Sequence, residues 1–184
     1  MTRSLAVKVR AKVEWAYEDA LDLSTPKDDD LISLLKSLTN GTGSDNVNRM
    51  WHDRRRLSQS SGTDSLDLSG GLTDIFGNTI TFSKIKVLFV YNKGVRSGST
   101  WVQTPGQDIL VGGAGAAGFA WASWLNNNQD AEERLRSGGI LLTTCPEEGW
   151  PVSPGTGDIL QITWDGSAAS GDDIDYDIFI AGVE

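Results

Sequence analysis

The chain has 184 residues, of which 39% are hydrophobic and 22% are charged, a balance typical of one folded domain and not of a disordered chain. Its 16 basic and 25 acidic residues give a net charge of −9, which disfavours general attraction to nucleic acid or to anionic membranes. With one cysteine, Cys145, and one histidine, His52, the chain has no internal disulfide and no zinc site of the usual Cys/His spacing.

The N-terminal region has the clearest strand pattern. Between Val7 and Trp15, apolar residues alternate strictly with charged ones, which predicts a strand with one dry and one wet face. The wet face has Lys8, Arg10 and Lys12, which could meet an acidic neighbour or could be a solvated face that protects a sheet edge. We therefore expect residues 1–20 to form an arm or an edge strand. Neither a signal peptide nor a membrane span is predicted.

The next segment contains a cluster of aspartates. Residues 27–30, after Pro26, predict an exposed turn, and their spacing lacks the alternating ligands of a calcium loop. Residues 31–38 suit either a short helix or a buried strand, because periodicity alone does not distinguish the two.

A run of three arginines, Arg54 to Arg56, follows His52 and Asp53. In a strand three successive side chains cannot share one face, so we expect salt bridges to neighbouring carboxylates and not a nucleic-acid site. For the same reason Asp53 would point away from His52, which argues against a catalytic pair that uses the only imidazole.

Residues 79–91 predict a central strand with a bulge or bend at Ser83-Lys84, and residues 92–94 are expected to end it. Residues 158–164 and 174–181 predict further strands. Short strands that recur every 8–12 residues indicate one all-β domain over residues 1–184, an antiparallel β-sandwich or jelly roll.

A glycine-rich stretch at residues 108–119 can be interpreted in two ways. Gly113, Gly115 and Gly118 have the spacing of a dinucleotide-binding turn, but the chain lacks the βαβ context which that site requires. We therefore expect a core strand at residues 109–111 and then a bend. The bend would deliver Phe119, Trp121 and Trp124 to a core or a subunit interface, and no cofactor is expected.

Asp173, Asp175 and Asp177 lie on one face of a predicted strand, which could supply paired carboxylates for glycoside hydrolysis. A polar face on a half-buried strand is the simpler interpretation. Four tryptophans, Trp101, Trp121, Trp124 and Trp150, could stack sugars, so carbohydrate binding is kept as an alternative.

The order of turn-and-strand motifs between residues 5 and 182 is more informative than any single motif. The motifs are residues 39–45, 51–55, 66–77, 82–86, 109–115, 137–142, 157–162 and 176–182. In this order they resemble small virion proteins of tailed bacteriophages, in particular the jelly-roll head-decoration, or cement, proteins. Polar inserts at residues 93–106 and 126–136 depart from the shorter pattern of that family.

The resemblance implies a non-enzymatic structural protein that binds the outside of the phage head and stabilises it. It implies a homotrimer in contact with the major capsid protein, made in the host cytoplasm, with no nucleic-acid or membrane partner. We place the capsid contact at Lys8, Arg10 and Lys12 and the outer loops on the side of Trp121 and Trp124. The alternative is a tail or surface module of the virion that recognises carbohydrate.

Overall fold

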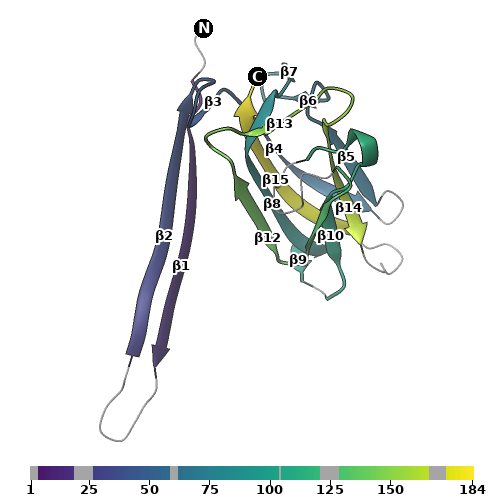
Figure 1. The fold of residues 1–184 in the computed structure, drawn as a ribbon. Helices are drawn as coiled ribbons and strands as arrows, with labels where there is room; N and C mark the ends of the chain where they lie inside the picture. The colour runs from purple at the N-terminus through teal and green to yellow at the C-terminus, as the bar shows by residue number, and fades with distance from the viewer. Residues whose placement is uncertain (1–3, 19–26, 59–61, 104, 121–128, 166–172) are drawn as a thin grey trace, which may run out of the picture.

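The computed structural model describes residues 4–18, 27–58, 62–103, 105–120, 129–165 and 173–184. Strands dominate the described part of the chain, which also contains a short 3₁₀ helix at Gly115–Ala117. The strands form a sandwich-shaped body and a long β-hairpin, here called the arm, that projects from one end of the body (Figure 1).

Two antiparallel sheets make up the body. One sheet, here called the outer sheet, has the order β4 (Arg49–Ser58), β15 (Asp173–Val183), β8 (Lys84–Ser97) and β12 (Ile140–Thr144). The other has the order β5 (Thr63–Asp67), β14 (Ile159–Asp165), β10 (Asp108–Gly112) and β11 (Glu132–Leu135).

The connections identify the topology. The chain passes between the two sheets from β4 to β5, from β11 to β12 and from β14 to β15, and among the eight strands of the two four-stranded rows only β10 and β11 are consecutive neighbours. This is the strand order of a jelly roll, in which two Greek keys are wrapped into a sandwich. The prediction of an all-β antiparallel sandwich or jelly roll is therefore confirmed.

Short strands complete the body. β9 (Thr100–Val102) and β13 (Trp150–Pro151) pair with β8 at its two ends. β6 (Leu72–Thr73) and β7 (Thr79–Ile80) form a small separate hairpin.

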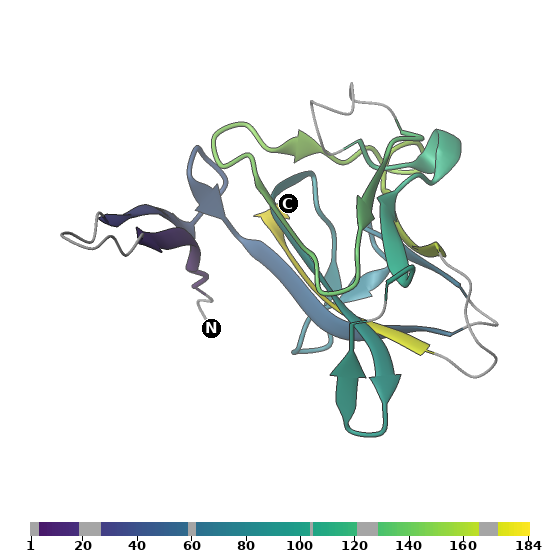
Figure 2. The same cartoon turned by 90° about the horizontal axis from the view of Figure 1, so that it is seen from below.

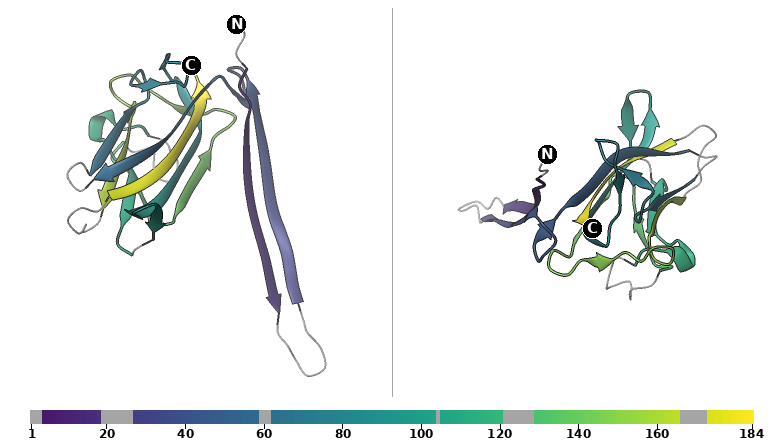
Figure 3. Two further views of the ribbon diagram at one scale, coloured as in Figure 1. Left: turned by 180° about the vertical axis from the view of Figure 1, so that it is seen from behind. Right: turned by 90° about the horizontal axis from the view of Figure 1, so that it is seen from above.

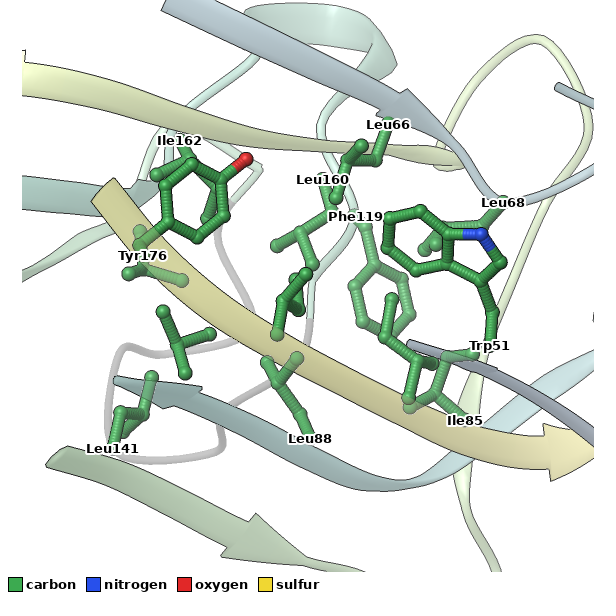
Figure 4. Close-up of a cluster of buried hydrophobic side chains, with 14 of the residues drawn as sticks. Trp51, Leu66, Leu68, Ile85, Leu88, Phe119, Leu141, Leu160, Ile162 and Tyr176 are labelled. Carbon is green, nitrogen blue, oxygen red and sulfur yellow. The ribbon is translucent and has the colours of Figure 1, made fainter. Parts of the chain in front are cut away.

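The main core lies between the two sheets and is built from alternate residues of their strands (Figure 4). Leu88 and Tyr176 enter it from the outer sheet, and Leu160 enters it from the opposite sheet. All three are fully buried. Phe119, just after the glycine-rich stretch, also lies in this core, as the sequence predicts.

The arm consists of β1 (Val7–Glu18) and β2 (Lys27–Asn40), which pair without a register shift from Val7↔Leu38 to Glu18↔Lys27. Seen from the side and from below, it stands apart from the body along most of its length (Figures 1 and 2). The views from behind and from above show the same separation (Figure 3). The N-terminal strand is therefore half of a hairpin arm that extends to Asn40.

A second, smaller hydrophobic cluster attaches the arm to the body. Val7, Val9 and Leu38 at the base of the arm are buried against Val87 and Ala181, which lie on the outward face of the outer sheet. β3 (Asn46–Val47) pairs in parallel with the end of β2 and adds Val47 to this cluster. The buried part of β1 ends at Val9, and the strand is exposed from Arg10 onward.

Two sequence predictions for the arm are wrong. Residues 27–30 are not a turn but the first residues of β2, where they pair with the end of β1. Residues 31–38 form a strand, but Leu38 is the only buried residue among them. A two-stranded ribbon has no interior, so its apolar side chains stay exposed unless another element covers them.

The central strand also differs from its prediction. The expected bend at Ser83-Lys84 is a break between β7 and β8, and β8 runs through residues 92–94 to Ser97. It continues because β9 and β15 both pair with it there, with a register shift opposite Asp175 and Tyr176. At Gly94, with φ +89°, a Cβ atom would lie 2.5 Å from the carbonyl oxygen of Val102. Glycine thus lets the strand continue where the sequence predicts its end.

Candidate functional site

The three cations predicted as an interface lie together on the arm. Lys8, Arg10 and Lys12 are exposed on one face of β1, since residues two apart in a strand share a face. Lys12 forms an ion pair with Glu14 on the same face. The structure therefore brings these residues together on a projecting element, away from the jelly-roll core.

The opposite face of the arm is apolar. Here Ala11 pairs with Leu34 and Val13 with Ile32, and Trp15 and Tyr17 continue the row toward the tip. The exposed fraction is 63% for Val13 and 66% for Ile32. The alternation of β1 predicts an apolar face, but it does not predict that the body leaves this face uncovered.

The outward face of the outer sheet has a charged region far from the arm base. Arg54 of β4 donates to Asp177 of β15 at 2.7 Å, and Arg56 donates to Asp175 at 2.8 Å and lies 3.4 Å from Asp173. The predicted salt bridges of the arginine run are confirmed. The three aspartates do lie on one face of a strand, and each of them has a cationic partner.

Trp101 covers part of this charged region. Its Nε1 donates to Asp175 at 2.9 Å, and the Nζ of Lys93 lies 3.6 Å from its ring centroid. Burial opposes ionisation of Asp175, but hydrogen bonds from Arg56 and Trp101 outweigh this effect and hold its pKa below the ordinary range. Because Lys93 occupies a face of the Trp101 ring, that face is not an open platform for a sugar.

The middle arginine points into the sandwich. Arg55 forms a two-point ion pair with Asp64 of β5, with its Nη2 3.0 Å from the carboxylate, and the hydroxyl of Tyr176 donates to Asp64 at 2.5 Å. Burial and the bond to Asp64 raise the pKa of Tyr176, so its hydroxyl stays protonated. These three residues join the two sheets and serve the fold.

His52 is exposed and faces outward beside Phe179, the residue of β15 with which it pairs. It lines a surface groove of about 740 Å³ at the base of the arm, with Leu5, Met50, Asp74 and Ile75. Asp53 follows His52 in β4 and accepts from the backbone N–H of Arg54 at 2.8 Å.

The glycine-rich stretch does not have the geometry of a dinucleotide site. β10 pairs with antiparallel neighbours on both sides, and the turn after it leads into a 3₁₀ helix of three residues. A phosphate site of that kind requires a longer helix after a parallel strand. Gly113, with φ +77°, also packs so closely against Glu132 that a Cβ would clash with its side chain. The bend therefore places Phe119 in the core.

Trp121 and Trp124, predicted as interface residues, lie outside the described residues. Among the residues that the structure does describe, no cluster of His, Cys, Asp and Glu side chains could hold a metal ion. That part of the chain also contains no helix of the length and hydrophobicity needed to cross a membrane.

The arm and the face of the outer sheet beside it are thus two features of the described chain that exceed what the fold requires. Both expose side chains of a kind that a monomer normally buries. Comparisons with protein-family models, with curated proteins and with solved structures returned no match. The function is therefore argued from this geometry and from the sequence.

Proposed function

We propose that this protein is a non-enzymatic structural protein of a tailed-bacteriophage virion, a decoration protein that binds the outside of the head and stabilises it. It is made in the host cytoplasm and joins the virion as a homotrimer that contacts the major capsid protein. The observation that carries the proposal is the arm, in which a 12-residue strand and a 14-residue strand pair with each other and, within the described chain, have their buried contacts with the body at the base alone.

An isolated two-stranded hairpin is marginally stable in water. This arm gains little from its own body, because the buried residues of β1 and β2 are Val7, Val9 and Leu38 at the base. It therefore needs an external partner to hold its extended form. Attachment to a larger assembly supplies such a partner.

The charge distribution supports the same proposal. The chain as a whole is acidic, with a net charge of −9, while one face of β1 presents Lys8, Arg10 and Lys12. Opposite potentials on one molecule orient it on a partner surface. An acidic region of the capsid would attract this segment of β1 and repel most of the body, so that the body remains outside.

The jelly-roll body is compatible with this role and with others, since the fold is found in viral capsid proteins and also in lectins. A carbohydrate-binding role is the rival prediction from the sequence. It depends on aromatic platforms, and of its candidates Trp101 has Lys93 on a face of its ring. Binding of a host glycan that is lost in Trp121→Ala or Trp124→Ala would favour the rival.

The test is binding of the purified chain to heads of the phage that encodes it, prepared without this protein. We expect saturable binding that weakens with added salt, since exposed charge pairs are screened. Reversal of Lys8, Arg10 and Lys12 to Glu should weaken binding about tenfold or more, because each exposed pair contributes up to about 1 kcal/mol.

The matched control reverses three exposed cations of the body, Lys84, Arg96 and Arg136, and so changes the net charge by the same amount. This control should bind more tightly than the arm variant. Failure of the native chain to bind heads would contradict the proposed function, and equal losses in the two variants would contradict the placement of the contact on the arm.

A further inference from the structure

The apolar face of the arm comprises Ala11, Val13, Trp15, Tyr17, Ile32 and Leu34. Leu34 is 59% exposed and Tyr17 is 73% exposed, comparable to Val13 and Ile32. Continuous apolar surface of this kind on a soluble protein marks a site of association.

The same face of the arm is already in use at its base. Val7, Val9 and Val13 lie on the same face of β1, because every second residue of a strand points to one side. Val7 and Val9 pack on Val87 and Ala181. The arm thus begins with its apolar face on the outward face of the outer sheet. Toward the tip, the side chains of the same row no longer contact the outer sheet and are exposed.

The outward face of the outer sheet has a matching surface, here called the outer patch. It comprises Phe89 and Tyr91 of β8, Phe179 of β15, and Ile140 and Leu142 of β12. These side chains are neighbours, because Phe89 pairs with both Phe179 and Leu142, and Tyr91 pairs with Ile140. Ile140 is 62% exposed, and Phe179 makes the patch continuous with the cluster at the arm base.

Charged residues follow the apolar ones in the same order on both surfaces. Toward the tip of the arm, Asp30 pairs with Trp15 and Asp28 with Tyr17 on the apolar face. Beyond the outer patch, away from the arm base, lie Arg54, Arg56 and Lys93. These cations already pair with Asp173, Asp175 and Asp177, so an arm that lies along an outer patch would place its aspartates beside a network of charges of both signs.

The arm cannot readily reach the patch of its own chain, because several bonds fix its base. The backbone N–H of Asp45 donates to the carbonyl of Pro146 at 3.0 Å, and the Nζ of Lys86 donates to that of Gly43 at 2.6 Å. Lys36 of β2 forms an ion pair with Asp45 at 2.8 Å. These contacts hold the arm at the angle at which it leaves the body (Figures 1 and 3).

We propose that the apolar face of the arm packs on the outer patch of a second copy of this chain. In a homotrimer, this contact between two different surfaces is of the head-to-tail type and closes into a ring under threefold symmetry. It leaves Lys8, Arg10 and Lys12 on the uncovered face of the arm. The inference rests on the self-association included in the proposed function, and its test uses the purified chain alone, so that its failure is distinct from a failure of capsid binding.

The first experiment measures the mass of the chain by sedimentation equilibrium at the highest soluble concentration. The native chain should be a closed oligomer. Val13→Asp on the arm and Ile140→Asp on the patch should each reduce it to a monomer, although both residues are exposed in the single chain and neither change disturbs the core. Ser33→Asp, an exposed control on the opposite face of the arm, should leave the oligomer intact.

The second experiment identifies the occupant of the patch. In a Cys145→Ser background with native mass, chains with Val13→Cys and chains with Ile140→Cys are produced together, distinguished by a tag, and treated with a short bis-maleimide. We expect a cross-link between the two kinds of chain, and far less of it when Ser33→Cys replaces Val13→Cys.

A monomeric native chain, or an oligomer that persists in both aspartate variants, would overturn the proposal. So would a doubly substituted Val13→Cys/Ile140→Cys chain that forms only the cross-link within one chain, because that result would place the arm on its own body.

Discussion

Asp64 occupies one of the positions at which the two sheets of the body are joined by polar contacts. It receives hydrogen bonds from Arg55 of β4 and from Tyr176 of β15, while it belongs to β5 of the opposite sheet. A buried carboxylate with several donors is stable as an ion, but removal of one donor leaves part of its charge poorly solvated. Stability at this point therefore depends on the complete set.

Replacement of Tyr176 by Phe tests this view at the scale of one atom. The change removes the hydroxyl and keeps the ring in the core, so the free energy of unfolding should fall by about 2 kcal/mol, as expected for a hydrogen bond to a charged group. Chemical denaturation measures the loss. Tyr17→Phe, at an exposed tyrosine of the arm, is the matched control and should change stability by about 0.5 kcal/mol or less. Equal stability of the two variants would show that the Asp64 bond is unimportant.

Part of this arrangement can be predicted from the sequence. Alternation in a strand separates Arg55 from Arg54 and Arg56, and the excess of carboxylates predicts salt bridges for all three. The partners themselves are not predictable, because Asp177 lies 123 residues from Arg54 and is brought beside it only by the jelly-roll topology. Local pattern thus specifies the faces, and long-range pairing specifies the contacts.

At the scale of the element, the arm also shows that local pattern specifies the faces of a strand but not what those faces contact. The period of two in β1 predicts a strand and its two faces. For the partner strand, however, the sequence predicts a turn at residues 27–30 and then either a helix or a buried strand. Apolar residues occur on both faces of β2, with Ile32 and Leu34 on one and Leu31 and Leu35 on the other. No single strand pattern distinguishes such a ribbon from a strand buried on both sides.

A shortened arm tests whether the body is independent of it. Ala11 and Leu34 are directly paired, so residues 12–33 can be replaced by Asn-Gly, which forms a tight two-residue turn. Val7, Val9 and Leu38 remain, and the main core contains no residue of the arm. The melting temperature of the body should change by only a few degrees, while the oligomer is lost.

The measurements are thermal unfolding and sedimentation of the shortened chain beside the native chain. Loss of folded structure in the shortened chain would show that the arm is part of the folding unit. An intact oligomer would instead show that the contact between copies lies elsewhere on the molecule.

At the scale of the whole molecule, we propose that the core, the apolar surfaces and the cationic face of the arm have three different tasks. The jelly-roll core supplies a rigid body, with all-β packing that is explained by the alternation of its strands. The apolar face of the arm and the outer patch are assigned to contact between copies. We propose that the cationic face of the arm, with Lys8, Arg10 and Lys12, meets the capsid and that the acidic remainder of the molecule faces solvent.

The fold class can be predicted from the recurrence of short strands and turns in the sequence. The assembly cannot be predicted in this way. The proposed assembly depends on side chains such as Ile140 and Leu142, which have the same pattern in sequence whether they face a core, a neighbour or water. Their exposure in the folded chain, 62% and 37%, is what distinguishes them from core residues.

The most direct test of the central claim is a cryo-electron microscopy reconstruction of the intact virion. We predict density for the jelly-roll body on the outside of the head, arranged in closed rings. Each arm should lie on the outer patch of the next copy, with its cationic face toward the major capsid protein. A head surface without this density, or the same density in the tail, would contradict this prediction.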